Sequence, residues 1–113
     1  MTDRTKPVEF VGSSLSELRA FPIGARREAG HQIDRLQRGL DPDDWKPMRA
    51  IGAGVREIRI RESDGTFRVI YVAKFEEAIF VLRCFQKKTE RTSREDVASA
   101  TRRYKELLKE LGR

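Results

Sequence analysis

Hydrophobic positions recur at helical spacing in two long stretches of the chain. Between Ile23 and Leu40, apolar residues return every three or four positions, and charged residues mostly fall on the other faces. Residues 97–111 show the same spacing, and Ser93 and Asp96 just before them have the spacing of a capping box. Both stretches therefore predict amphipathic helices that bury one face.

The amino-terminal part predicts a short strand followed by a short helix. Residues 7–11 group apolar side chains around Glu9, which favours a strand. Ser14 and Glu17 have the spacing of a capping box, so we expect a brief helix there that ends before Pro22. Pro22 suits the first turn of the next helix, because the amide that proline lacks would be unpaired there.

The middle of the chain changes to a period of two. In residues 55–61, Ile58 and Ile60 alternate with charged residues, which is typical of a strand with one apolar and one charged face. Asp64-Gly65 is a tight-turn signal, and residues 66–73 form the returning strand. Residues 78–85 are apolar at nearly every position, as expected at the centre of a sheet.

Together these elements predict a single α+β domain over residues 1–113 with the order β-α-α-β-β-β-α. Consecutive hairpins predict a mostly antiparallel sheet, and we expect the helices to pack on one face of it. The other face would then present the charged side chains of the hairpin to solvent.

Composition adds a preference for polyanionic partners. The 113 residues carry a formal net charge of +6, which favours nucleic acid, an anionic surface or an acidic protein. Cys84 is the only cysteine and lies in an apolar run, so we expect a buried, inert thiol and no intrachain disulfide. We expect a cytoplasmic protein, since no stretch resembles a signal peptide or a membrane span.

The cations gather in two places along the predicted sheet. Residues 83–94 contain five cations against one anion, Glu90, and so carry four of the six excess charges. On the hairpin, Glu57, Arg59 and Arg61 point to one side of their strand, and Arg68 lies on the facing strand. If the open face of the sheet carries these residues, both groups border one concavity.

Such a concavity suits the cleavage of RNA. Clustered Arg and Lys attract phosphates, and Arg can grip a phosphate with two donors. Cleavage through the 2′-hydroxyl needs a base for the 2′ proton, cations for the charge on the phosphorane and an acid for the leaving oxygen. Glu57 is one candidate base, and a Lys whose pKa is lowered by cationic neighbours is another.

Two groups of candidate residues follow. The residues expected to be catalytic are Glu57, Arg59, Arg61, Arg68, Lys87 and Lys88. The residues expected to bind RNA are Arg56, Arg83, Thr89, Arg91 and Arg94. Alternating charges are equally typical of the solvated face of an antiparallel sheet, and Glu57 could simply pair with a neighbouring Arg.

Other chemistries find little support in the sequence. His31 is the only histidine, which excludes a nuclease that uses a histidine pair. No His, Cys or Asp cluster has metal-ligand spacing, and residues 41–44 are better explained as a turn, so we expect no metal and no other cofactor. The glycines of residues 52–54 lack the lysine and the following helix of a phosphate-binding loop.

The order of elements and two motifs resemble the phage-derived Gp49-like/HigB branch of the RelE/ParE toxin superfamily. The motifs are the hairpin of residues 55–71 and the Phe85–Thr89 segment, which precedes an amphipathic helix; the resemblance spans residues 8–108. It implies a RelE-like fold and an endoribonuclease that cuts mRNA, typically on the ribosome, without a metal. The cationic positions of such toxins fall on Arg59, Arg61, Arg68, and Lys87 or Lys88.

The resemblance also implies partners. We expect a cognate antitoxin, typically a HigA-like helix-turn-helix protein, besides mRNA and the ribosome, and neither a membrane nor a small-molecule substrate. Some relatives carry a Tyr or His after the last strand, where this chain has Thr89 and Thr92, so the general acid and base stay unassigned. Two alternatives remain open: a ParE-like toxin directed at DNA gyrase, and a basic nucleic-acid-binding module without activity.

Overall fold

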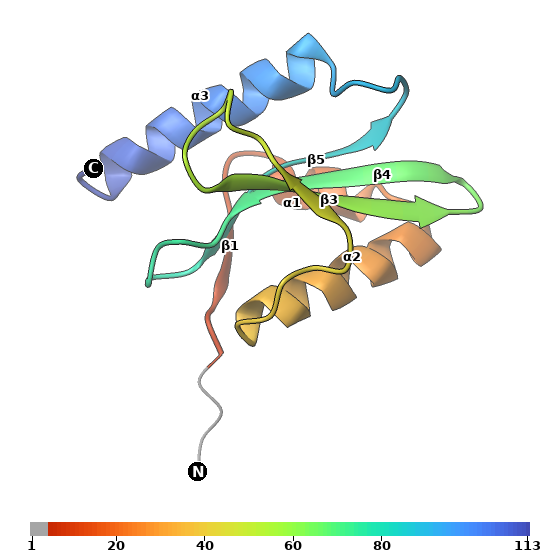
Figure 1. Cartoon of the computed structure of the whole chain (residues 1–113), viewed down its shortest axis with the longest axis horizontal. Helices are drawn as coiled ribbons and strands as arrows, with labels where there is room; N and C mark the ends of the chain where they lie inside the picture. The colour runs from red at the N-terminus through yellow and green to blue at the C-terminus, as the bar shows by residue number, and fades with distance from the viewer. Residues whose placement is uncertain (1–4) are drawn as a thin grey trace.

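A central sheet of five strands organises the chain in the computed structural model, which describes residues 5–113 (Figure 1). Residues 1–4 of the predicted domain lie outside the described residues. The elements in chain order are β1 (Val8–Phe10), α1 (Ser14–Arg19), α2 (Ile23–Gln37), β2 (Trp45–Pro47), β3 (Val55–Glu62), β4 (Gly65–Val72), β5 (Ile79–Lys87) and α3 (Arg94–Glu110).

The strand order across the sheet is β1-β5-β4-β3-β2. Three of the pairings are antiparallel, and only β1 runs parallel to its neighbour, β5. The tight turn between β3 and β4 places Gly65 at φ 133°, a conformation that favours glycine, as the Asp64-Gly65 signal predicts. The predicted α+β class and the mostly antiparallel sheet are therefore confirmed.

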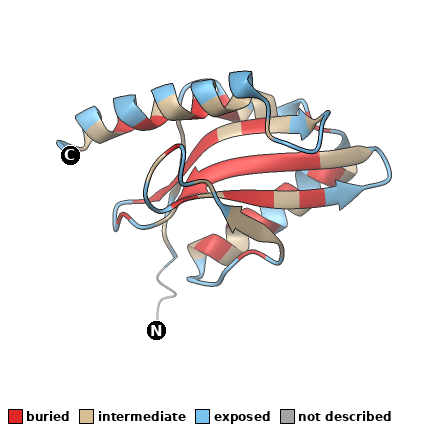
Figure 2. Ribbon diagram, turned by 45° about the horizontal axis from the view of Figure 1, so that its top comes forward, coloured by how far each residue is buried: buried red, intermediate tan, exposed pale blue. Residues whose placement is uncertain are grey.

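The helices lie on both faces of the sheet, so the prediction that they cover one face is wrong. One hydrophobic cluster joins α2, through residues such as Ala29 and Ile33, to Ile58 and Val69 of the sheet. A second cluster joins α3, through Tyr104 and its neighbours, to the opposite face. The reason is that β4 and β5 are apolar on both sides, and Figure 2 shows these strands buried along most of their length. Both faces therefore need a cover.

The α3 face of the sheet is covered at one end only. Val55, Ile70 and Leu82 pack in the cluster beneath α3. Side chains alternate along a strand, so Glu57 on β3 and Arg68 on β4 project to this same face, toward the end where the hairpin turns. This end of the hairpin lies at the same end of the sheet as the connection that leads into α3 (Figure 1).

Of the two predicted capping boxes, only one forms in the structure. Ser93 caps α3 as expected, because its hydroxyl accepts a hydrogen bond from the amide of Asp96 at 3.1 Å. Ser14 does not act as a cap: its hydroxyl donates to the carbonyl of Val81, and the side chain of Glu17 binds arginines instead. The side chains of Ser14 and Glu17 therefore bind partners on β5 and α3 instead of the backbone amides of their own helix.

The sheet is also larger than predicted. Residues 45–47, between the acidic turn and the glycine-rich segment, form the edge strand β2, which pairs with β3. At the other end, β5 continues to Lys87 instead of stopping at Phe85, because Lys87 pairs with Thr66 of β4. This extension puts Lys87 on the sheet rather than in the following connection.

Candidate active site

An open pocket of about 510 Å³ lies where β3 and β5 end and β4 begins, beside the connection to α3. Its lining is mostly cationic and includes four of the six residues predicted to be catalytic. The lining residues are Arg61, Thr66, Arg68, Lys87, Lys88, Thr89 and Glu90. The structure thus joins the two groups of cations, from the hairpin and from the end of β5, that the sequence keeps far apart.

Strand pairing sets the floor of this pocket. Thr66 of β4 lies opposite Arg61 on one side and opposite Lys87 on the other. One row across three strands therefore carries a cation, a hydroxyl and a second cation. Arg59 and Arg68 form the next row as a directly opposed pair. Two arginines so close repel each other unless an anion lies between or above them.

Arg68 is the most deeply placed of these cations. Its side chain is 4% exposed, and its Nε and Nη1 atoms form no hydrogen bond within the described residues. Burial, together with the charges of Arg59 and Arg61, lowers the pKa of Arg68, while the charge of Glu57 partly offsets this. A buried guanidinium with free donors at the floor of a pocket is suited to bind a phosphate oxygen.

Arg59 adds a second unfilled donor beside it. The Nε atom of Arg59 is buried and has no hydrogen-bond partner among the described residues. Unpaired buried donors are costly, and a ligand that accepts hydrogen bonds relieves that cost. Arg59 and Arg68 together therefore favour an anionic ligand with several acceptor oxygens.

Lys87 has the features of a proton-transfer group. Partial desolvation, followed by the charges of Arg68 and Lys46, lowers the pKa of Lys87 below the ordinary lysine value. A lysine among cations is expected to show such a lowered pKa, and in this structure Lys87 does. A lysine that loses its proton more readily is a better base near neutral pH.

Glu57 does not line the pocket, although the sequence names it as a candidate base. Its side chain is fully buried, with an exposed fraction of 0%. It is surrounded by partners: the hydroxyl of Thr92 donates to Oε2 at 2.7 Å, and Arg68 and Lys46 approach Oε1. A carboxylate in this position is suited to hold cations from beneath, and it has no direct path to a ligand in the pocket.

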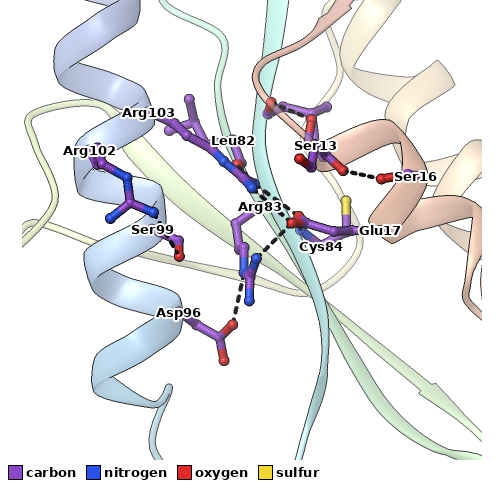
Figure 3. Close-up of polar contacts among 12 residues, drawn as sticks. Ser13, Ser16, Glu17, Leu82, Arg83, Cys84, Asp96, Ser99, Arg102 and Arg103 are labelled. Carbon is purple, nitrogen blue, oxygen red and sulfur yellow. Dashed lines mark hydrogen bonds and ion pairs between the residues drawn. The ribbon is translucent and has the colours of Figure 1, made fainter.

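Two residues predicted to bind RNA lie elsewhere. Arg56 projects to the opposite face of the sheet, where it stacks over the ring of Trp45 at 4.0 Å and pairs with Asp41. Arg83 is committed to an ion-pair network away from the pocket (Figure 3). The structure therefore brings neither of them to the pocket.

The Arg83 network ties three elements together. Arg83 of β5 binds Glu17 of α1 at 2.6 Å and Asp96 of α3 at 2.9 Å, and Arg103 of α3 binds Glu17 at 2.9 Å (Figure 3). Burial acts to raise the pKa of Glu17, but the hydrogen bonds from Arg103 and from the Cys84 amide, with the nearby charges, outweigh it and lower the pKa. This network positions α3, and with it the end of the connection beside the pocket.

The remaining predicted residues lie on the rim. Lys88 and Thr89 line the pocket from the connection after β5. The Thr89 hydroxyl donates to the carbonyl of Arg91, which helps to shape this connection. Arg91 in the connection and Arg94 at the start of α3 are exposed, and no ion pair to either is found among the described residues.

Sequence reasoning misses three residues of this region. Lys46 reaches Glu57 from β2, a strand too short to give a pattern and one that ends in a proline. Thr66 and Thr92 carry no charge, so the search for cations passes over Thr66 and leaves Thr92 without a role. Their signal in the sequence is weak: a threonine directly after a tight turn, and another before a capped helix.

The described residues include neither a group of side chains placed to hold a metal ion nor a helix able to span a membrane. Within residues 5–113, no group of three or more His, Cys, Asp or Glu side chains is placed to hold a metal ion. No helix among these residues is both long and apolar enough to cross a bilayer. Cys84 is buried, and burial raises the pKa of its thiol, as expected for an inert cysteine.

Comparison with protein families identifies the chain. Residues 16–105 match the model of the family described as phage-derived protein Gp49-like (DUF891). The chain belongs to this family. The match covers the sheet from β2 onward, all of α2 and the larger part of α3, so the Gp49-like resemblance seen in the hairpin and in the Phe85–Thr89 segment is confirmed. Comparison with curated proteins finds no match.

Solved structures confirm the fold of this Gp49-like protein. It is similar to a mutant of the E. coli toxin RelE in the free state, with a TM-score of 0.65 and 16% identity over 88% of this chain and 97% of that one. The toxin–antitoxin complex RelBE2 from Mycobacterium tuberculosis matches with a TM-score of 0.49 and 23% identity over 74% of this chain and 99% of that one. The likeness to RelE shows that the chain has the RelE fold.

Proposed function

We propose that this Gp49-like protein is the toxin of a type II toxin–antitoxin system and acts as an endoribonuclease on mRNA. The observation that carries the proposal is the buried Arg68 guanidinium, with unpaired donors, at the floor of a cationic pocket beside a lysine of lowered pKa. The first feature suits a phosphate, and the second suits removal of a proton from a neighbouring hydroxyl.

In the proposed reaction the scissile phosphate lies over Arg68, with Arg61 on the rim. The neutral amine of Lys87 accepts the proton of the 2′-hydroxyl, and the 2′ oxygen forms a bond to phosphorus. The bond from phosphorus to the 5′ oxygen then breaks, which leaves a 2′,3′-cyclic phosphate on one product and a 5′-hydroxyl on the other. Arg59 and Arg68 stabilise the charge that develops on the phosphorane.

The leaving 5′ oxygen needs a proton. Lys88 lines the same pocket from the connection after β5, and we assign the acid role to its ammonium group. Protons then balance: one moves from the 2′-hydroxyl to Lys87 and one from Lys88 to the 5′ oxygen. No metal takes part in this scheme, because cationic side chains supply the charge at every oxygen of the phosphate.

The proposal includes the setting in which the reaction occurs. A net charge of +6 favours association with RNA, and we place the action of the toxin in the cytoplasm, on mRNA held by the ribosome. The structurally similar RelE is itself described as a toxin. We propose a HigA-like antitoxin as the cognate partner, which would keep the pocket from mRNA.

Purified protein and programmed ribosomes test this function. The wild type should cut the mRNA, and a single 2′-deoxynucleotide at the cleavage position should stop the cut there. Arg68→Lys keeps the charge but loses the two-pronged grip, so we expect roughly 10²-fold slower cleavage. Arg27→Ala, an exposed arginine on α2 across the sheet, is the matched control and should cut like the wild type.

Each other outcome assigns a different function. Equal cleavage of free and ribosome-bound mRNA would remove the ribosome from the proposal but keep the nuclease. Cleavage that persists with the 2′-deoxynucleotide would overturn the proposed chemistry. If neither RNA is cut, the nuclease proposal fails, and inhibition of DNA gyrase in a supercoiling assay would favour the ParE-like alternative.

A further inference from the structure

A fully buried carboxylate lies directly beneath the cationic pocket. Glu57 lies on β3 between Val55, which packs under α3, and Arg59, which lies opposite the pocket residue Arg68. Burying a charged carboxylate is costly unless partners compensate it. The proposed reaction makes no use of Glu57, so its burial at this place calls for another explanation.

The partners of Glu57 come from three different elements. Lys46 Nζ of β2 lies 3.8 Å from Oε1, and Arg68 Nη1 of β4 lies 3.5 Å from the same oxygen. On the other side, the hydroxyl of Thr92, in the connection before α3, donates to Oε2 at 2.7 Å. The carboxylate therefore joins an edge strand, a central strand and the segment that frames the pocket.

The contact with Arg68 is an ion pair without a hydrogen bond. Both Oε1 of Glu57 and Nη1 of Arg68 are buried and lack a hydrogen-bond partner among the described residues. The carboxylate thus balances the charge of the guanidinium while leaving the N–H groups of Nε and Nη1 unpaired. A ligand in the pocket can then take those donors without first breaking a hydrogen bond.

The contact with Thr92 has a different consequence. Residues 88–90 line the pocket, and Thr92 lies two residues after them. Its hydrogen bond fixes the far end of the connection to the floor of the site, while Lys87, at the end of β5, fixes the near end. The rim that carries Lys88 is therefore held at both ends.

We propose that Glu57 is a positioning residue of this site, which holds Arg68 and Lys46 beneath the pocket and, through Thr92, anchors the rim formed by residues 88–92. It acts through these neighbours and does not touch the substrate. The inference rests in part on the proposed function, because it assigns Glu57 to the same pocket. Its geometric content, an anchored rim and a compensated cation cluster, stands apart from RNA cleavage.

The negative charge of Glu57 also acts on Lys87. The charged groups around the Lys87 amine are Lys46 on β2, Glu57, Arg59 and Arg61 on β3, Arg68 on β4, and Lys88 and Glu90 on the connection. Among the strand residues of this set, Glu57 is the only anion. Removing its charge should therefore lower the pKa of Lys87 further, since only cations would remain on the strands beside it.

Lysine titration by NMR tests the electrostatic part, and backbone order parameters from ¹⁵N relaxation test the anchor. We compare the wild type with Glu57→Gln, which keeps the shape and an acceptor, and with Thr92→Val and Thr92→Ser. In Glu57→Gln the midpoint of the Lys87 side-chain titration should fall below that of the wild type. In Thr92→Val the backbone order parameters of residues 88–92 should fall below those of the wild type, because the connection loses its hydrogen bond to Glu57, and Thr92→Ser should restore them.

Two results would contradict this role of Glu57. An unchanged or higher Lys87 midpoint in Glu57→Gln would overturn the electrostatic role, and unchanged order parameters of residues 88–92 in Thr92→Val would overturn the anchor. If Glu57→Gln does not fold, the Thr92 pair still decides the anchor. Lys46→Gln, whose side chain is about one-third exposed, then tests the cluster, because loss of a neighbouring cation should raise the Lys87 midpoint.

These readouts separate the inference from the proposed function. Both can be measured without RNA, so a wild type that cuts no mRNA would refute the nuclease while leaving the role of Glu57 open to confirmation. If the nuclease is real, Glu57→Gln should shift the pH profile of cleavage to lower pH. A catalytic base at Glu57 predicts instead that Glu57→Gln abolishes cleavage at every pH, and a purely structural role predicts an unshifted profile.

Discussion

At the scale of single residues, the site depends on how residues on neighbouring strands change one another's pKa. Lys87 lies opposite Thr66, next to the row of Arg59 and Arg68, and these surroundings lower its pKa. The sequence shows that cations are numerous here, but not which one loses its proton most readily. That depends on burial and on distances across strands, which only the folded sheet defines.

The first residue-scale prediction concerns Lys87 as the base. Because a base must be neutral to accept a proton, the cleavage rate of the wild type should rise with pH through the Lys87 pKa, which lies below that of an ordinary lysine. Lys87→Met should slow cleavage by roughly 10²- to 10⁴-fold and flatten this rise. Single-turnover rates between pH 6 and pH 10 check both statements, and an unchanged profile in the variant would refute the assignment.

The second prediction concerns Lys88 as the acid. Lys88→Gln should cleave ordinary RNA roughly 10²-fold more slowly, since the 5′ oxygen then leaves without a proton. A substrate with sulfur in place of the bridging 5′ oxygen needs no acid, so it should be cut by the variant at nearly the wild-type rate. Slow cleavage of both substrates by Lys88→Gln would place the acid elsewhere.

At the scale of elements, strongly patterned segments are predictable and short ones are not. The hairpin of β3 and β4, the apolar strand β5 and the helix α3 lie where the periodicity predicts, because each buries a face whose spacing the sequence shows. The edge strand β2 escapes prediction, since three residues that include Trp45 and Pro47 show no period. The cover on both faces follows from β5, whose unbroken apolar run already indicates burial on both sides.

Whether a charged residue is buried is harder to predict from the sequence than whether it lies on a strand. Glu57 and Arg83 alternate with apolar residues as exposed residues do, yet one is fully buried and the other joins α1 to α3. Their partners, such as Thr92 and Glu17, lie 35 and 66 residues away in the sequence. Local spacing therefore places a charge on a face but does not show what covers that face.

The ion-pair network of Glu17 leads to a prediction about stability. Its folded pKa lies below the unfolded value of 4.5, so its contribution is fully present above pH 4.5 and is lost as the pH falls through the folded pKa. Glu17→Gln should lower the free energy of unfolding by about 2 kcal/mol at pH 7 and by less as the pH falls below 4.5. Urea unfolding of the wild type and of Glu17→Gln, at pH 7 and at a pH below 4.5, measures this difference in the free energy of unfolding.

A matched control for Glu17 is available on the surface. Glu77 pairs with Arg113 at 3.2 Å, but both side chains are more than 40% exposed. Water screens such a pair, so Glu77→Gln should change stability far less than Glu17→Gln at the same pH. Equal effects of the two substitutions would show that the network of Figure 3 has no special role in holding α1, β5 and α3 together.

At the scale of the whole molecule, the RelE fold gathers cations at one end of its sheet. The hairpin, the end of β5 and the connection to α3 meet there, and α3 leaves this part of its face uncovered (Figure 1). The sequence contains the cations and the motifs of the Gp49-like family, and these predict that the candidate site lies near the hairpin and the end of β5. The pocket itself, with Arg68 buried beneath it, becomes visible only once β5 is paired to Lys87.

The most direct test of the central claim is to map the 5′ ends of mRNA after induced expression in bacteria. Wild-type protein and Arg27→Ala should arrest growth and produce new 5′-hydroxyl ends inside translated messages, whereas Lys87→Met should produce neither at equal protein levels. Growth arrest without new ends, or new ends that persist in Lys87→Met, would contradict the account of this pocket as the site of RNA cleavage.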